Sequence, residues 1–374
     1  AIMAQHGINA TYPTIAALAD AEGINVAEGI RWQTEALRAN PQTTGYGLLS
    51  YNDASWEIGA GLVDQRRRPK PAYAAVAGVN APTLLALSGH LRNVRCGESL
   101  TMRCALVDEQ RRRGAASLVW RVHDRQGHLV GEGRRRMRLP GAAVHECGEF
   151  SLRLEAEGRY TASAVLQTPE GEVCRATADV YVWDEARRSP LATAMQQVGG
   201  VWLIAHPGAA ERTALAGALA DAAAGGVCIF LDMLDADVQH VNDMGILPFA
   251  IDARCAPSSW LAYLHYARAH PILDGLPAPG LLGRQEYNAV LPRRSLLGLP
   301  GETVVVGVSS TGLERARRQA VQPAFWAGSD LHIAAWGKGT LIFSQFLLRV
   351  EVGRDPVADR LLRRLLRYAT SLVR

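Results

Sequence analysis

Lysine is almost absent from this chain, and the arginines that replace it do not form a nucleic-acid-binding pattern. Of the 40 basic residues 38 are arginine, and Lys70 and Lys338 are the only lysines. The arginines gather in three separate runs, at residues 66–68, 111–113 and 134–136, without the interleaved aromatic residues of a single-strand binder. The net charge is only +4. We therefore expect no nucleic-acid partner and assign these runs to solvated loops and strand ends.

Metal-binding spacings are also missing. The six cysteines include no C-x-x-C pair, and the ten histidines show no H-x-H or H-E-x-x-H spacing, so we expect neither a metal site nor a cofactor. Four cysteines lie between residues 96 and 174, which would permit a disulfide in an exported protein, but buried free thiols explain them equally well. The six are Cys96, Cys104, Cys147, Cys174, Cys228 and Cys255.

Long apolar runs are absent as well. No segment contains 18 uninterrupted apolar residues, so no membrane partner is expected, and the compartment is left open. The chain opens with Ala1, and residues 2–7 already look like interior sequence, so we expect the true N-terminus to lie upstream.

The composition itself is that of an ordinary globular protein. With 374 residues, of which 48% are apolar and 20% charged, the chain predicts two or three domains at about 100–200 residues per domain. Residues 15–38 read as helix and loop, ended by Asn40-Pro41. Residues 45–51 read as a short buried strand that delivers Asn52 and Asp53 into a loop. Helix, strand and polar strand end are typical of a β/α barrel.

The middle of the chain has a different pattern. From about residue 84 to 183, short alternating strands are separated by turns such as Asp124-Arg125-Gln126-Gly127 and Pro169-Glu170-Gly171. This pattern predicts a β-sandwich of immunoglobulin-like size. The strands are expected at residues 99–107, 117–123, 128–133, 148–154, 160–167 and 173–182.

A third pattern follows the polar stretch 184–190. Strand 201–205, helix 211–224 and strand 227–231 alternate, which predicts a parallel, doubly wound sheet. Further core strands are expected at residues 304–308 and 341–346, and an amphipathic helix at residues 356–372 is expected to close the domain.

A family resemblance lies in residues 45–76. With Thr44 in front, this segment reads TGYGLLSYNDASWEIGAGLVDQRRRPKPAYAAV. Asn52-Asp53, Ser55-Trp56, Val63-Asp64 and Arg68-Pro69-Lys70-Pro71-Ala72-Tyr73 occur in order. They resemble the last barrel strand and following loop of family 2 glycoside hydrolases, especially the β-mannosidase and β-galactosidase-like branches. The family's strand tryptophan is matched by Leu49 here.

The resemblance implies an order of domains. Family 2 enzymes often continue into immunoglobulin-like sandwiches, and residues 118–127 look like a strand and turn of that kind. Residues 270–277 and 336–343 resemble the class I glutamine-amidotransferase-like domain that some bacterial members append. We therefore expect a partial (β/α)8 barrel end over residues 1–82, an Ig-like β-sandwich over 83–184, and an amidotransferase-like α/β domain over 185–374.

The same resemblance places no catalytic residue in this chain. Retaining glycosidases need two carboxyl groups about 5–5.5 Å apart, and in family 2 both are glutamates on earlier barrel strands. Glu22, Glu28 and Glu35 fall in the helix-and-loop stretch and are expected to be solvated. Asn52, Asp53 and Trp56 are the expected substrate-binding residues, because amide and carboxylate groups bind sugar hydroxyls and an indole stacks on a pyranose.

We do not expect the amidotransferase-like domain to have amidotransferase activity. Around Cys228 the sequence reads Gly-Val-Cys-Ile-Phe, so Phe230 replaces the second glycine of a nucleophile elbow, and a buried structural cysteine is predicted. Likewise, Gly337-Lys338-Gly339-Thr340 lacks the first glycine of a phosphate loop and is expected to be a hairpin turn.

Three functional hypotheses remain. The first is a C-terminal fragment of a retaining glycoside hydrolase with a carbohydrate substrate, whose accessory domains stabilise or oligomerise the parent. The second is a non-catalytic carbohydrate-binding or scaffolding protein. The third is a true amidotransferase.

Overall fold

The computed structural model describes residues 1–48, 51–53, 61–89, 93–255, 263–283, 285–310 and 325–373. The chain forms two compact units, residues 23–186 and residues 1–22 together with 187–374. The sequence places one boundary at residue 184, close to this division, but the structure shows no separate unit at residues 1–82. Instead, residues 1–22 pack with the C-terminal part of the chain.

The expected barrel strand is not formed by residues 45–48. Helix α2 (Ile15–Ala39) ends where Asn40-Pro41 predicts, and α3 (Pro71–Val79) begins with a proline at its first position, where no N–H is needed. Between them, Leu48 is 40% exposed and Asn52 makes only an isolated bridge to Val63. A buried strand needs neighbouring strands on both sides, and no strand within the described residues pairs with residues 45–48.

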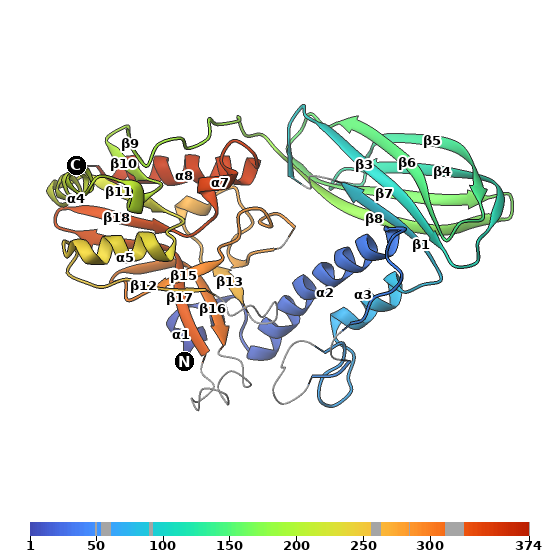
Figure 1. Ribbon diagram of the computed structural model, residues 1–374, viewed down its shortest axis with the longest axis horizontal. Helices are drawn as coiled ribbons and strands as arrows, with labels where there is room; N and C mark the ends of the chain where they lie inside the picture. Colours follow the sequence, from blue (N-terminus) through green and yellow to red (C-terminus); the bar gives the residue numbers. More distant parts are fainter. Residues whose placement is uncertain are drawn as a thin grey trace. The chain divides into compact units, whose positions relative to one another are not determined.

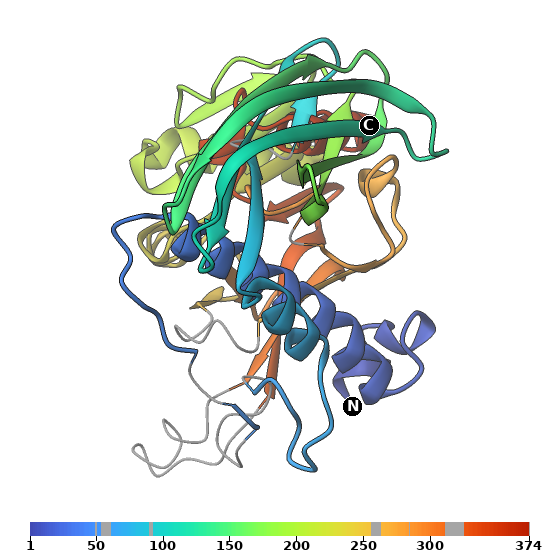
Figure 2. The ribbon, with the colours of Figure 1, turned by 90° about the vertical axis from the view of Figure 1, so that its right-hand side faces the viewer.

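The expected β-sandwich is present in residues 83–183 (Figure 2, cyan to light green). One sheet has the order β1-β3-β6 and the other β2-β8-β7-β4-β5, and their inner faces share one apolar core. Trp120 stacks on Phe150 with ring centroids 4.4 Å apart, and Gly133 makes room because a Cβ there would lie 2.6 Å from the indole. The strands are β1 (Thr83–Gly89), β2 (Asn93–Arg95), β3 (Ser99–Asp108), β4 (Arg113–His123), β5 (Leu129–Pro140), β6 (Val144–Arg153), β7 (Gly158–Thr168) and β8 (Gly171–Trp183).

The other unit is built on a ten-stranded sheet (Figure 1). Its main path runs β14-β13-β16-β17-β18-β11-β10-β9, with β12 and β15 to the side. The strands are β9 (Met195–Val198), β10 (Val201–Ile204), β11 (Val227–Leu231), β12 (Asp252–Cys255), β13 (Leu264–Ala267), β14 (Gly280–Leu281), β15 (Arg294–Leu297), β16 (Glu302–Ser310), β17 (Phe325–Trp336) and β18 (Gly339–Ser344). The helices are α1 (Ile2–Gln5), α4 (Arg212–Ala224), α5 (Asp235–Met244), α7 (Leu348–Glu351) and α8 (Pro356–Leu372).

The expectation of a parallel, doubly wound sheet is wrong for most of this sheet. Only β10, β11 and β18 are parallel to one another, and the other paired strands run antiparallel. Parallel neighbours need a crossover of a dozen or more residues. Helix α4 provides one between β10 and β11, whereas only Gly337 and Lys338 separate β17 from β18 and form the predicted hairpin turn.

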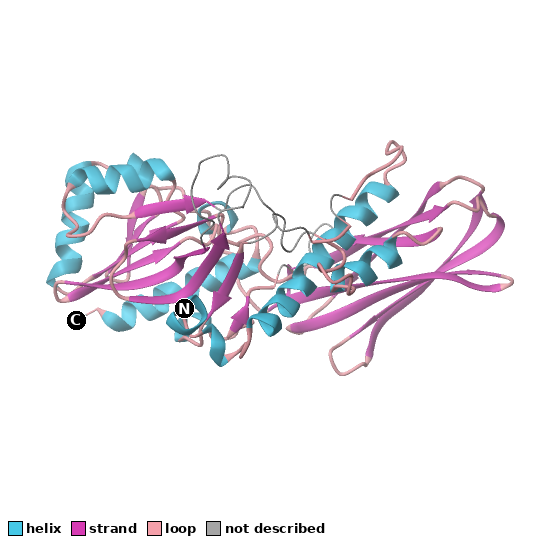
Figure 3. Cartoon of the chain, turned by 90° about the horizontal axis from the view of Figure 1, so that it is seen from below, coloured by secondary structure: helices cyan, strands magenta, loops and turns pink. Residues whose placement is uncertain are grey.

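Helices cover both faces of the parallel strands (Figure 3). Cys228 and Phe230 of β11 pack with α4 and α5, and Phe230 stacks on Phe343 of β18. Helix α8 lies against β10 and β11 and buries the predicted apolar side chains. These are Leu361, Leu362, Leu365 and Ala369, with Leu366 half-buried.

The N-terminal residues add to this unit in a way that the sequence did not predict. Ile8 is buried with Tyr266 and Val306. The Tyr266 hydroxyl donates a hydrogen bond to the carbonyl oxygen of Gly7 at 3.2 Å, and the Tyr12 hydroxyl accepts one from the N–H of Leu281 at 3.2 Å. Residues 1–22 therefore contribute core and hydrogen bonds to the edge of the sheet at β13 and β14.

The cysteines whose side chains are described are free thiols, and Cys228 is buried as predicted. It is fully inaccessible, its thiol donates a hydrogen bond to the carbonyl oxygen of Ala218 at 3.2 Å, and burial raises its pKa to about 12. Because thiol reagents react with the thiolate, native-state alkylation at pH 8 followed by peptide mass mapping should leave Cys228 unmodified until the protein unfolds. Half-buried Cys96 is the internal comparison. Modification of Cys228 as fast as that of Cys96 would contradict the structure.

Candidate functional site

Asn52 and Asp53 lie in an irregular segment that folds back on itself. Asn52 forms a parallel bridge with Val63, and the N–H of Asp53 donates to the carbonyl oxygen of Val63 at 2.9 Å. Val63 in turn bridges Pro69, so three short stretches lie side by side before α3 begins. The structure thus brings the two ends of the family-like motif together.

The Asp53 carboxylate is held by the chain itself. Asp53 is only 9% exposed, and its Oδ1 accepts hydrogen bonds from the N–H of Gly61 at 2.8 Å and from Lys70 Nζ at 3.0 Å. Gly61 is required here, because a Cβ would lie 2.2 Å from the backbone nitrogen of Asp53. A buried carboxylate is stable only with such donors. One of the two lysines in the chain therefore closes this loop.

Asp64 organises the next turn. Its Oδ1 accepts hydrogen bonds from the N–H groups of Arg66 and Arg68, and its Oδ2 accepts one from Arg68 Nε at 2.6 Å. The hydrogen bond from the backbone of Arg68 is the main cause that lowers the pKa of Asp64. The N–H of Lys70 then donates to the carbonyl oxygen of Leu62 at 3.0 Å, immediately before α3.

Other residues singled out in the sequence fall elsewhere. Trp56, the third expected sugar-binding residue, and Leu49 lie outside the described residues. Glu35 lies on α2 and pairs with Arg31 four residues earlier at 3.5 Å. Glu22 and Glu28 also lie on α2.

A second polar cluster lies where the three parallel strands end. Carboxyl ends of parallel strands share one edge of a sheet, which is where α/β proteins commonly bind ligands. Here His206, Asp232 and Gln345 follow β10, β11 and β18, respectively. Gln345 is fully buried and bonds Met233 twice, accepting from its N–H at 2.9 Å and donating to its carbonyl oxygen at 3.1 Å.

Arg349 joins these strand ends to helix α5. It donates to the carbonyl oxygen of Asp232 at 2.9 Å, to Asp237 Oδ2 at 2.7 Å and to His206 Nδ1. Burial favours a higher pKa for Asp237, but hydrogen bonds from the N–H groups of Leu234 and Gly208 and from Arg349 bring it below its ordinary value. Burial and the charge of Arg349 lower the pKa of His206, which favours the neutral form of its ring.

Asp232 is the exception in this cluster. It is 6% exposed, and its carboxylate accepts no hydrogen bond within the described part of the chain. Its φ of 40° places a non-glycine residue in the left-handed region, a strained conformation typical of functional turns. Burial raises its pKa to about 6, although Arg349 and Arg294 oppose the shift.

A third group of polar residues is a buried network centred on Asp330. Its two carboxylate oxygens accept from the Ser295 hydroxyl at 2.5 Å and contact His265 Nδ1 at 2.7 Å. Gly307 leaves the space, since a Cβ would lie 2.1 Å from Ser295 Oγ. Ser295 and His265 both contact Asp330, whereas a catalytic triad needs serine bonded to histidine. The arrangement is that of a structural network.

The described residues contain neither a cluster of metal ligands nor a membrane-spanning helix. Among the residues with described positions, no group of three or more His, Cys, Asp or Glu side chains could hold a metal ion. In the same residues, no helix is both long and apolar enough to span a membrane.

No protein-family model and no curated protein matches the chain. Solved structures with partial similarity include β-D-mannosidase from Dictyoglomus thermophilum, at 14% identity and a TM-score of 0.35, covering 41% of this chain and 18% of that chain. A family 2 glycosyl hydrolase from Bacteroides cellulosilyticus DSM 14838 matches at 14% identity and a TM-score of 0.23, covering 43% and 25% of the two chains. A β-glucuronidase from Parabacteroides merdae matches at 10% identity and a TM-score of 0.22, covering 44% and 24%.

This chain therefore spans a quarter or less of the length of these three proteins. At TM-scores this low, the similarities carry no argument about its activity.

Because the pKa of Asp232 is raised in the folded protein, we expect the free energy of unfolding to depend on pH. Its pKa is about 6 in the folded protein and near 3.8 in the unfolded chain, so folding takes up a proton between these values. The protein should lose stability as the pH rises from about 4 to about 6, by up to about 3 kcal/mol in total, and this loss is complete at pH 8. Asp232→Asn removes the charge, and Asn tolerates a positive φ. This variant should raise the urea midpoint at both pH values, but roughly three times more at pH 8 than at pH 4.5.

Asp243→Asn, which removes an exposed carboxylate from helix α5, is the control and should show no such difference. An Asp232→Asn variant with equal effects at both pH values would contradict the assignment.

Proposed function

We propose that this chain is the C-terminal part of a glycoside hydrolase related to family 2. The parent protein hydrolyses O-glycosidic bonds by a retaining double displacement, and its two catalytic glutamates lie upstream of residue 1. The β-sandwich and the α/β unit are accessory parts that stabilise or oligomerise the parent.

The observation that carries this proposal is the motif between Asn52 and Tyr73. Its described charged residues make specific contacts in one compact segment: Asp53 with Lys70, and Asp64 with the turn before Pro69. Pro71 then starts α3. The ion pair of buried Asp53 with Lys70, and the close approach of backbone at Gly61, hold the residues of the motif together in space.

Within this proposal the three expected sugar-site residues have different tasks. We propose that Asn52 and Trp56 face the substrate in the parent. Asp53 acts as a positioning residue, because its carboxylate already accepts hydrogen bonds from Lys70 and Gly61. Lys70, whose side chain is 22% exposed, acts with Asp53 as a positioning residue.

The first test compares this chain with the upstream-extended protein. The 374-residue chain alone should not hydrolyse p-nitrophenyl β-mannoside or β-galactoside, because it lacks the two positioned glutamates. The extended protein should hydrolyse at least one such glycoside. An extended protein that binds oligosaccharides without hydrolysing any glycoside would instead support a carbohydrate-binding or scaffolding function. Release of ammonia from glutamine by this chain would indicate an amidotransferase.

A second prediction concerns the Asp53–Lys70 pair in the extended protein. If Asp53 positions the loop, Asp53→Asn and Lys70→Met should each lower kcat/KM by roughly tenfold or more, because small misplacements near a site are costly. Both variants should also lower the melting temperature. Asp20→Asn, which changes an exposed carboxylate on α2, is the charge-matched control. A loss of activity with Asp53→Asn alone, while Lys70→Met keeps wild-type kinetics, would show that Asp53 contacts the sugar directly.

A further inference from the structure

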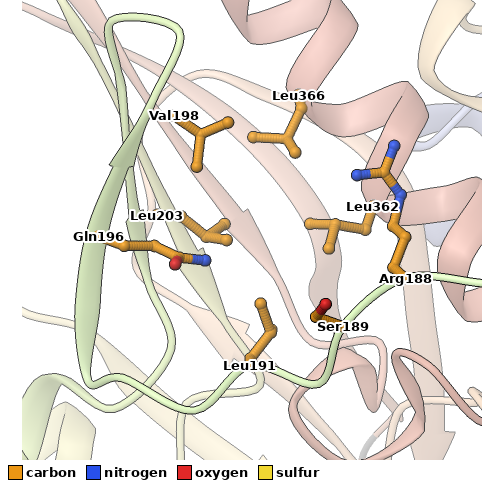
Figure 4. Close-up of a pocket in the computed structure, with 8 residues that line it drawn as sticks. All are labelled: Arg188, Ser189, Leu191, Gln196, Val198, Leu203, Leu362 and Leu366. Carbon is orange, nitrogen blue, oxygen red and sulfur yellow. The ribbon is translucent and has the colours of Figure 1, made fainter.

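A pocket of about 340 Å³ opens beside helix α8 in the α/β unit (Figure 4). Leu362 and Leu366 of α8 form one wall, and Val198 and Leu203 of the β9–β10 hairpin form the opposite wall. Leu191 of the segment before β9 lies at the end shown lowest in Figure 4. Five aliphatic side chains thus surround a space at the small end of the range for small-molecule sites, about 300–1,000 Å³.

Among the described residues that line this pocket, Arg188 is the only one that is charged. Figure 4 shows its side chain running alongside Leu362. Its Nε is fully buried and has no hydrogen-bond partner, and within the described part of the chain its guanidinium group makes neither a hydrogen bond nor an ion pair. A buried donor left without an acceptor costs about 1–3 kcal/mol, and more when it is charged. Such a group calls for an acceptor from outside the chain.

The Arg188 backbone is fixed independently of its side chain. Its N–H donates to Asp359 Oδ2 at 3.4 Å, and Asp359, which is fully buried, also accepts from the N–H of Gly353 at 2.8 Å. The neighbouring Arg187 donates to the carbonyl oxygen of Gly353 at 3.0 Å. The segment that carries Arg188 is therefore anchored, while its guanidinium group is left unpaired at the pocket wall.

We propose that this pocket binds a small monocarboxylate with an apolar chain or ring. The carboxylate pairs with the guanidinium group of Arg188, which supplies charge-assisted hydrogen bonds, and the apolar part lies between α8 and the β9–β10 hairpin. Gln196 and Ser189 provide further polar atoms at the pocket. A single lining cation matches a single negative charge, and the nearby Asp359 carboxylate disfavours a dianion such as a phosphate monoester.

The test uses the 374-residue chain and three probes of equal chain length: octanoate, 1-octanol and octyl phosphate. Isothermal titration at pH 7.5 should show octanoate binding at least about tenfold more tightly than octanol, because octanol keeps the apolar contacts but loses the charge-assisted hydrogen bonds. Octyl phosphate should bind more weakly than octanoate. Arg188→Gln should weaken octanoate binding by about tenfold or more and leave octanol binding unchanged.

Arg367→Gln is the matched control, since it removes an exposed arginine from α8. It should leave octanoate binding unchanged. Val198→Trp, at an exposed position on the pocket wall, should weaken the binding of both octanoate and octanol. If Arg188→Gln fails to fold, the octanoate-to-octanol ratio of the unaltered chain and the Val198→Trp result still decide. Equal affinity for octanoate and octanol, tighter binding of octyl phosphate, or no binding of octanoate at millimolar concentration would overturn the proposal.

Discussion

Buried carboxylates need hydrogen-bond donors, and this requirement organises the irregular parts of the protein. Asp53 gathers the N–H of Gly61 and the ammonium group of Lys70, and Asp237 gathers two backbone N–H groups and Arg349. Asp330 does the same between strands with Ser295 and His265. In each case the carboxylate ties together segments that are distant in the sequence, because a buried charge without partners would cost several kcal/mol.

The same requirement separates structural sites from sites that are open to a ligand. Within the described part of the chain, the carboxylate of buried Asp232 accepts no hydrogen bond, and the buried Nε of Arg188 has no acceptor. Both lie in the α/β unit, one at the carboxyl edge of the parallel strands and the other beside α8. By contrast, the motif around Asp53 is satisfied internally, which is why we assign Asp53 a positioning role.

The sequence predicted regular elements well and long-range polar contacts poorly. Alternation and turn residues located the sandwich strands, and the leucine spacing of α8 predicted its buried face, because these signals are local. The prediction of a parallel sheet was wrong where a short connection forces two strands into an antiparallel hairpin, as between β17 and β18. Residues 45–48 looked like a strand by composition, but no partner strand pairs with them in the described structure. The cluster around Arg349 brings together residues as distant in the sequence as His206 and Arg349. The sequence indicated it only through the polar residue that follows each buried strand.

The Asp53–Lys70 pair holds together the short stretches around Asn52, Val63 and Pro69 through a desolvated interaction. A double-mutant cycle of Asp53→Asn and Lys70→Met, measured by urea unfolding, tests it most directly, with the exposed Arg121–Glu132 pair as the reference. We expect a coupling energy of about 1.5 kcal/mol or more for Asp53–Lys70, against about 0.2–1 kcal/mol for the exposed pair. Equal coupling energies for the two pairs would show that the Asp53–Lys70 pair does not hold these stretches together.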